Sequence, residues 1–378
     1  MDNQSIFLSF DEISTVIKAH HANGLRRTIL IEGENGIGKT AVYHALRNDP
    51  MFADHIAVDP IDATQLSDGS VWMPDIDREA GVSRELPNER FGLSKTNRLG
   101  VNGSRPVLCF IDEFAKAAPY VKNILAPLIY NYRNGDYHFP EGSHVITATN
   151  LGIEGLGDNI PAHIRNRLIR VKMRKPTLNE TRAYGERNGW DYRVIATLVK
   201  HPQVFDSFLD YEEGGKYAGK SLAKDNPLIY NPREMQDAYA SPRSFEAASD
   251  IVKTLDDVGM NLVRAQLWGA IGPFAENICT TIRLGNTLPD YSLIMRDPAN
   301  APLVQDPVAQ MIQVQQFVSF VNTREEAEAS TIYVQRMREE MCQLYVQQIS
   351  TSTKVNVFVT VEAFRELLRL NRKFLDLN

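Results

Sequence analysis

The first half of the chain alternates short, unbroken apolar runs with stretches in which apolar residues return at helical spacing. Apolar side chains recur every three or four positions in residues 12–21, which predicts a helix. Residues 28–32 then form an apolar run typical of a buried strand, and residues 39–47 return to helical spacing. Four more β-rich runs follow, at residues 55–58, 107–111, 144–149 and 168–173. This alternation predicts an α/β fold, with a parallel five-stranded sheet covered by helices on both faces.

Two segments of this half need separate interpretation. Residues 119–132 have core spacing and predict a helix, in which Pro127 is expected to cause a kink or a break. Gly135 is the expected cap at the end of that helix. Residues 59–105 are rich in Asp, Gly, Pro and Arg, and they predict an irregular insertion or a hairpin ahead of the third strand.

Beyond about residue 177 the spacing is helical, and the next strand-like run is NVFVTV at residues 356–361. Residues 210–232, rich in Gly, Lys and Asn, predict a loop. We therefore expect an α/β domain at residues 1–176, a helical domain at 177–300 and a C-terminal helical extension at 301–378.

Composition narrows the class of protein. The 378 residues include 43% hydrophobic side chains, enough for two or three cores. A net charge of -6 argues against a protein that holds nucleic acid mainly by neutralising phosphates. The three cysteines are far apart and form neither a disulfide framework nor a CxxC motif, and Cys109 is expected to be a small core residue. The first residues do not resemble a signal peptide, and no run of 18 apolar residues occurs, so we expect a cytoplasmic protein without a membrane segment.

The segment GENGIGKT, residues 33–40, matches the phosphate-loop pattern G-x-x-x-x-G-K-S/T. Glycines let the backbone curl so that its N–H groups face a phosphate, and the helix that follows adds its positive N-terminus. Lys39 would reach the β- and γ-phosphates of ATP, and Thr40 would place a hydroxyl on Mg²⁺. The alternative is a glycine-rich turn with a solvated lysine, but the position between a strand and a helix favours phosphate binding. The residues expected to contact the nucleotide are Gly33, Glu34, Asn35, Gly36, Ile37, Gly38, Lys39, Thr40 and Ala41.

Polar residues follow two of the other strands. Asp112 and Glu113 come directly after the apolar run 107–111. Taken alone, two such acids more often sit at a helix N-terminus, but with a phosphate loop on the same sheet Asp112 would hold the metal and Glu113 would polarise the attacking water. Asn150 ends the strand at 144–149 and either orients that water or caps a turn.

Three arginines are candidates for contacts with phosphate. Arg165 and Arg167 precede the fifth strand, where an arginine finger could reach the nucleotide of a neighbouring subunit. Arg243 falls in the first turn of a helix that begins at SPRSF, where a cation opposes the helix dipole and calls for an anionic partner. A lone arginine is usually a surface charge, so only the ordered set of motifs favours these roles.

In this order the motifs resemble those of AAA+ ATPases, more narrowly the MoxR type, including its dynein-related branch in bacteria and phages. The resemblance rests on IEGENGIGKT, on residues 111–150, on NIPAHIRNRLIRVKM and on SPRSFEAAS, and it includes a short hairpin at Gly135–Gly142. It implies Lys39 and Thr40 as Walker A, Asp112 and Glu113 as Walker B, Asn150 as sensor 1, Arg167 as the trans finger with Arg165 as second candidate, and Arg243 as sensor 2. It also implies a helical lid domain after the P-loop NTPase domain.

Three functions are compatible with these features. The resemblance implies Mg-dependent ATP hydrolysis by a hexameric homo-oligomeric ring that remodels a protein partner, often beside von Willebrand factor A-type proteins. The second function is a motor or loader on DNA or RNA, which would use Arg26, Arg27, residues 84–105 and the lysines of the loop at 216–224. The third is a non-catalytic scaffold gated by nucleotide, and the presence of Glu113 counts against it. We favour the first.

Overall fold

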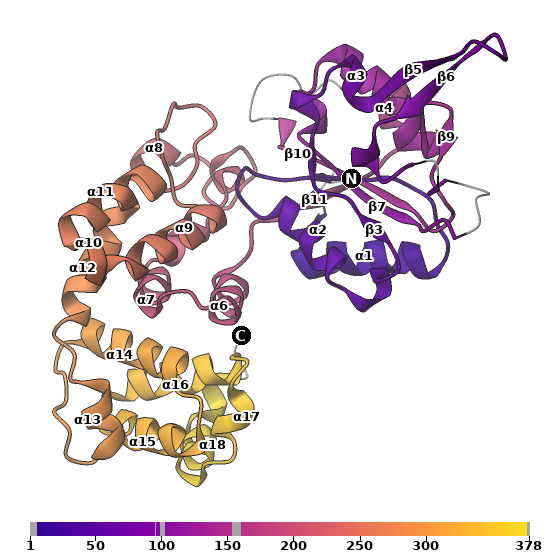
Figure 1. Cartoon of the computed structure of the whole chain (residues 1–378). Helices are drawn as coiled ribbons and strands as arrows, with labels where there is room; N and C mark the ends of the chain where they lie inside the picture. Colours follow the sequence, from indigo (N-terminus) through magenta and orange to yellow (C-terminus); the bar gives the residue numbers. More distant parts are fainter. Residues whose placement is uncertain (1–5, 95, 99–102, 153–159, 376–378) are drawn as a thin grey trace. The chain divides into compact units, whose positions relative to one another are not determined.

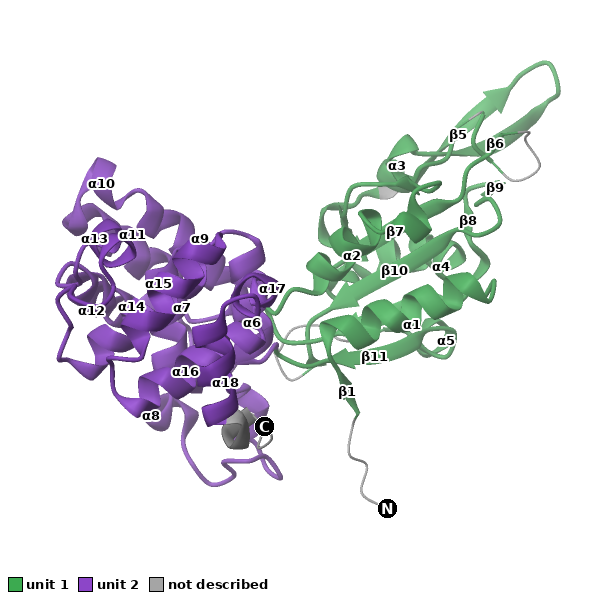
Figure 2. Ribbon diagram, turned by 90° about the horizontal axis from the view of Figure 1, so that it is seen from below, with its two compact units in different colours: residues 1–175 green, residues 176–378 purple. Residues whose placement is uncertain are grey.

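The computed structural model describes residues 6–94, 96–98, 103–152 and 160–375, with the backbone alone at residues 68 and 372–375. Residues 1–5 of the N-terminal segment, and Asn159 at the start of the arginine-bearing segment, lie outside the described residues. The chain divides into two compact units, Met1–Lys175 and Pro176–Asn378 (Figures 1 and 2). The boundaries predicted at 176 and 300 remain predictions.

The first unit is built on a parallel sheet. Its order is β1 (Phe7–Leu8), β11 (Ile169–Met173), β2 (Ile29–Glu32), β10 (His144–Thr149), β7 (Val107–Asp112) and β3 (Ile56–Ala57), and β4 (Ile61–Asp62) also pairs with β7. Every pair in this sheet is parallel. All five predicted strands are present, and the fold class, a parallel α/β sheet followed by a helical region, is confirmed. The two-residue strands β1 and β4 extend the sheet beyond the prediction.

Helices cover both faces of the sheet, as the unbroken apolar runs require. Helices α1 (Phe10–Ala22) and α2 (Lys39–Arg47) share one core with Leu108 and Phe110 of β7. Helix α4 (Pro119–Asn131) shares the other core with Cys109 and Ile111. Successive residues of β7 therefore enter opposite cores, because side chains alternate along a strand. Cys109 is fully buried, as expected for a small core residue.

The end of α4 differs from the prediction. Pro127 lies inside the helix, which continues to Asn131, and the cap in left-handed conformation is Tyr132 (φ 54°). The ring of Tyr132 is buried under the guanidinium of Arg26, 4.6 Å from its centroid, and this packing holds the aromatic residue at the cap. Gly135, predicted as the cap, instead forms the turn of a short hairpin, β8 (Arg133–Asn134) and β9 (Tyr137–His138).

The segment at residues 59–105 is a hairpin with short flanking elements. After β4 and the single turn α3 (Asp68–Val71) come β5 (Trp72–Asp77) and β6 (Val82–Pro87), which pair antiparallel over their whole length. The hairpin extends away from the main sheet and leaves Ile76 68% exposed (Figure 1). At its base it contacts the other hairpin, where the Asp136 N–H donates to the Glu85 carbonyl and Asp136 Oδ2 accepts from the Glu85 N–H.

The described residues of the second unit form helices joined by loops, with one isolated β-bridge between Ile229 and Ala240. Its α-helices are α6 (Leu178–Arg187), α7 (Tyr192–Lys200), α8 (Leu222–Asp225), α9 (Pro242–Lys253), α10 (Leu255–Val258), α11 (Met260–Ile271), α12 (Ala275–Gly285), α13 (Tyr291–Arg296), α14 (Pro307–Phe320), α15 (Arg324–Val334), α16 (Glu339–Ser350), α17 (Val355–Phe358) and α18 (Glu362–Leu375). They enclose two separate hydrophobic cores, one between Trp190 and Ile282 and the other between Ile294 and Leu367. None of the helices described here combines the length and apolar character that crossing a membrane requires.

One expectation for this unit was wrong. The run NVFVTV at 356–361, which suggests a strand by composition, begins inside helix α17. Phe358 packs against the rings of Tyr345 and Phe364, with centroids 5.8 and 5.5 Å away. Burial among helices accounts for the apolar run, since a short run of this kind does not distinguish a strand from a buried helical turn.

The contact between the two hairpins predicts a stability effect. A Cβ on Gly135 would lie 2.4 Å from the Glu85 carbonyl oxygen, and Gly135 also has φ +58°. Gly24 has φ +64° with no atom within 4 Å of an added Cβ, so Gly24→Ala isolates the backbone strain. We expect Gly135→Ala to lower the free energy of unfolding by about 1–3 kcal/mol more than Gly24→Ala, as overpacking does. Urea denaturation measures both, and equal losses would contradict the contact.

Candidate functional site

The predicted residues of the phosphate loop, together with Asp112, Glu113 and Asn150, gather at the carboxyl edge of the parallel sheet. The phosphate loop follows β2, Asp112 ends β7, and Asn150 follows β10. Because β10 pairs with both β2 and β7, it lies between them in the sheet. The three strand ends therefore meet, with Asn150 between the loop and Asp112.

The loop between β2 and α2 has the backbone of an anion site. Gly36 (φ 75°) and Gly38 (φ 99°) are left-handed, and Gly38 caps α2 without a side-chain hydrogen bond. A Cβ on Gly33 would lie 2.6 Å from Ile37 Cδ1 and 3.2 Å from the Met173 carbonyl oxygen, so the close packing of the loop on β11 needs glycine there. The N-terminus of α2, with its positive dipole end and no acidic residue in its first turn, favours a phosphate.

Lys39 is 8% exposed and held by oxygen atoms on two sides. Its Nζ donates to the carbonyl oxygens of Gly33 and Glu34, at 2.9 and 2.8 Å, and to Asn150 Oδ1 at 2.8 Å. Two carbonyl oxygens of the loop thus accept hydrogen bonds from the loop's own lysine, and Asn150, after the neighbouring strand β10, provides the third acceptor. A phosphate bound by the loop would meet a positive charge already positioned there.

Thr40 and Asp112 bring hard oxygen ligands together. Thr40 Oγ1 donates to Asp112 Oδ2 at 2.9 Å, and Asp112 Oδ1 accepts from the Glu113 N–H at 2.9 Å. A hydroxyl and a carboxylate are ligands that Mg²⁺ takes, with waters and phosphate oxygens completing its octahedron. The residues present therefore fit a magnesium ion bound together with a nucleotide.

Glu113 is a non-glycine residue in the left-handed region, with φ 52°. Its carboxylate is partly exposed and lies 2.9 Å from Lys116 Nζ. Left-handed backbone is unfavourable for such a residue and clusters at functional sites. Sequence reasoning missed Lys116, whose only signal was its position three residues after Glu113.

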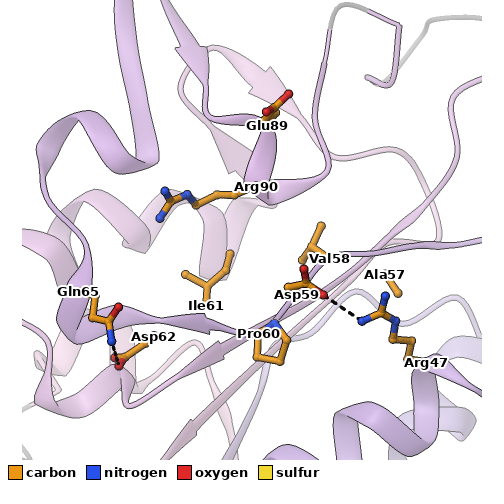
Figure 3. A pocket seen from close by; sticks show the side chains of 10 residues that line it. All are labelled: Arg47, Ala57, Val58, Asp59, Pro60, Ile61, Asp62, Gln65, Glu89 and Arg90. Atoms are coloured by element: carbon orange, nitrogen blue, oxygen red, sulfur yellow. Dashed lines mark hydrogen bonds and ion pairs between the residues drawn. The ribbon is translucent and has the colours of Figure 1, made fainter.

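Asp62 is a second acid that the sequence did not single out. In the pairing of β4 with β7 it lies opposite Asp112, and its carboxylate accepts from the Thr64 N–H and from Gln65 Nε2. It also lines an open groove of about 700 Å³, in which Figure 3 shows the ion pair of Arg47 with Asp59. One lining residue of this groove, Asp62, is therefore on the strand next to Asp112, the carboxylate expected to hold the metal. An acid that ends a two-residue strand leaves no periodic signal in the sequence.

Arg165 and Arg167 lie at the opposite edge of the sheet. Arg165 is the last residue of the short helix α5 (Ala162–Arg165), and Arg167 follows two residues later, before β11. Strand β11 runs parallel to β2, with Ile169 opposite Ile29. The four residues of β2 span about 13 Å. Both arginines are exposed, with Arg165 donating to the Ile160 carbonyl at 2.9 Å and Arg167 stacked 4.3 Å from the centroid of Tyr130.

Arg243 is exposed in the first turn of α9, which has a capping box made by Ser241 and Ser244. It belongs to the second unit, so its predicted contact with the nucleotide stays a prediction. The cap explains why this helix begins at SPRSF, since the Ser241 hydroxyl accepts from the Ser244 N–H.

Comparison with known proteins finds similarity to solved structures only. No family model and no curated protein matches the chain. Two mutants of RuvB from Thermotoga maritima are similar in structure, at 14% and 15% identity and a TM-score of 0.35 each, covering 78% and 77% of this chain and 78% and 74% of theirs. NtrX from Brucella abortus is similar at 13% identity and a TM-score of 0.32, covering 98% of this chain and 69% of its own. At these scores the fold assignment rests on the strand order and the loop.

The position of Lys39 predicts its effect on ATP binding. Lys39→Ala removes a buried cation aimed at the loop, and charge-assisted hydrogen bonds contribute about 1.5–3 kcal/mol, or roughly 10- to 100-fold in affinity. Lys18→Ala is the control, because Lys18 pairs with Asp49. Calorimetric titration with ATP should show this loss for Lys39→Ala only. Equal affinities in the two variants would argue against phosphate binding at the loop.

Proposed function

We propose that the chain is a Mg-dependent ATPase of the AAA+ kind. The observation that carries the proposal is the pair of direct bonds, Lys39 to Asn150 and Thr40 to Asp112, that joins three predicted motifs at one sheet edge. These residues are 111 and 72 positions apart in the chain, so their meeting is a property of the fold.

Each residue then has a separate task. The backbone of the loop and Lys39 hold the β- and γ-phosphates, and Thr40 and Asp112 hold Mg²⁺, which supplies charge neutralisation of the phosphates when bound. Glu113 accepts a proton from the attacking water, and Asn150 orients that water beside it. The salt bridge to Lys116 restricts the orientation of the Glu113 carboxylate.

From the position of the arginines we infer that the enzyme works in an assembly. Arg167 lies a strand length away from the loop of its own subunit, so we assign it to the nucleotide of a neighbour, with Arg165 as second candidate. Its guanidinium lies over the partly buried ring of Tyr130 on α4, and a cation–π contact of this kind contributes only about 0.5–1 kcal/mol where the cation is exposed. A finger used in trans requires a head-to-tail ring, and we propose a homo-hexamer in the cytoplasm. Arg243 is proposed as the contact from the helical unit.

Within this class we propose a MoxR-type enzyme that remodels a protein partner, which could include a von Willebrand factor A-type protein. The acidic net charge and the order of the motifs support this assignment. The exposed apolar residues of the β5–β6 hairpin, Met73, Ile76 and Val82, are a surface suited to a protein partner.

A motor on nucleic acid is the second candidate, and one observation favours it. Lys216 and Lys220 both lie over the ring of Tyr217, at 4.7 and 5.0 Å from the centroid. An aromatic ring flanked by cations is a pattern that binds single strands. Arg26, by contrast, is occupied by Tyr132 and the Phe139 carbonyl. Stimulation of the ATPase by DNA, with binding that falls steeply with salt, would select this candidate over protein remodelling.

Glu113→Gln tests the catalytic assignment. The amide keeps the size of the side chain but accepts no proton, so we expect turnover to fall by about 100-fold or more while ATP still binds. Glu79→Gln, at the exposed tip of the β5–β6 hairpin, is the control and should keep full activity. Phosphate release measures turnover. The nucleotide-gated scaffold survives only if the chain binds ATP and Glu113→Gln leaves its turnover unchanged, a result that would also contradict the role proposed for Glu113.

Mixing variants tests the finger. Arg167→Ala and Lys39→Ala subunits should each be inactive, yet a 1:1 mixture should recover about a quarter of full activity, the share of head-to-tail interfaces that combine an intact loop with an intact arginine. Lys39→Ala mixed with Glu113→Gln is the control and should recover nothing, because both defects lie in the same site. Absence of recovery in mixed rings would exclude Arg167 from action in trans.

A further inference from the structure

Three imidazole rings converge at the edge of the sheet opposite the phosphate loop. His21 lies at the end of α1, His55 directly before β3, and His144 is the first residue of β10. One nitrogen from each ring lies within 4.8 Å of the other two. We propose that this triad binds a divalent transition metal ion, with Zn²⁺ as its representative.

The tautomer of His55 suits a ligand. Its Nε2 lies 3.0 Å from the Gly142 carbonyl oxygen, which can only accept, so Nε2 carries the hydrogen and Nδ1 the lone pair. His55 is 7% exposed, and its Nδ1 is buried with no hydrogen-bond partner among the described residues. Metal-bound histidines have the same arrangement: one ring nitrogen binds the ion, and the other donates its N–H to a group such as a backbone carbonyl.

The other two rings already approach each other. His21 Nδ1 lies 3.0 Å from His144 Nε2. Two nitrogens on one tetrahedral zinc, each about 2.0–2.1 Å from the ion, stand roughly 3.3 Å apart, so this pair needs to open by only a few tenths of an ångström. His144 and His55 are both buried, so the nitrogens of the cluster lie away from bulk solvent. A hydrogen bond between the two rings is the competing explanation for their distance.

The surroundings decide which ion would fit. Phe52 closes one side, with its ring 4.8 Å from that of His21 and 5.1 Å from that of His55. Nitrogen ligands without a carboxylate select zinc, copper or nickel over magnesium, which separates this site from the oxygen ligands at Thr40 and Asp112. His21 is half-buried, and because the triad supplies three ligands, a water would complete a tetrahedral site.

Two cations limit the affinity. Arg26 carries its positive charge close to His144, and Arg105 carries its charge close to His55, so both oppose a bound ion. Their guanidinium groups donate to backbone carbonyls, Arg26 to Phe139 and Arg105 to Asp54 and His55. We therefore expect weaker binding than in a four-ligand structural zinc site. A bound ion would join α1, β3 and β10 and so raise the thermal stability of the first unit.

The test uses the full chain, treated with a chelator and titrated with Zn²⁺ without nucleotide. We expect one ion per chain, binding weakened by about tenfold or more in His21→Gln and His144→Gln, and a rise in Tm with Zn²⁺ that these variants lack. His44→Gln is the matched control, an exposed histidine on α2. Co²⁺ gives a second readout, since ligand-field absorption of a tetrahedral site should appear in the unaltered chain and disappear in the His21 variant.

The outcomes separate the explanations. Loss of binding with His21→Gln but not with Asp112→Asn supports the triad, whereas loss only with Asp112→Asn places the ion at the phosphate edge and overturns the proposal. Absence of Zn²⁺ binding, or equal binding in all histidine variants, overturns it as well and leaves a hydrogen bond between rings. Should His144→Gln not fold, His21→Gln at the half-exposed helix end carries the test alone.

Discussion

The parallel pairing of β10 between β2 and β7 is the constraint on which the site depends. It places Asn150 where its amide oxygen accepts from Lys39, and it brings Asp112 within 2.9 Å of the Thr40 hydroxyl. Antiparallel pairing would send one of these strand ends to the far edge. The register matters as well, because a shift by one residue would turn the side chains of β7 from one core to the other.

The structure could be predicted from the sequence where burial on both faces produces long apolar runs. Strands β2, β7 and β10 are almost entirely buried, so β2 and β7 are apolar up to their acidic last residues, and the threonines of β10 are themselves buried. Strands β1 and β4 have two residues each, too few for any period to appear. At Tyr132 and Phe358, contacts with distant residues, Arg26 and Tyr345 among them, determined the local conformation. Local composition therefore predicted the wrong cap and the wrong element.

The site residues that could be predicted are likewise those in contiguous sequence motifs, and those brought together by the tertiary fold could not be predicted. The phosphate loop and the Asp-Glu pair are contiguous motifs, so their residue types could be interpreted directly. The left-handed backbone of Glu113 and the place of Asp62 opposite Asp112 arise from the tertiary fold. The histidine triad is the extreme case, since His21 and His144 are 123 positions apart with no spacing that suggests a site.

The two edges of the sheet have different chemistry because every strand runs the same way. Residues that follow a strand lie at the same edge of the sheet as the phosphate loop, and residues that precede a strand lie at the opposite edge, a strand length away. Arg167 precedes β11 and therefore faces the wrong edge for the phosphates held by its own subunit. The distance of about 13 Å along β2 exceeds the reach of an arginine side chain. A phosphate bound at the loop would thus meet Lys39 from the loop itself, and Arg167 could act on it only from a neighbouring subunit.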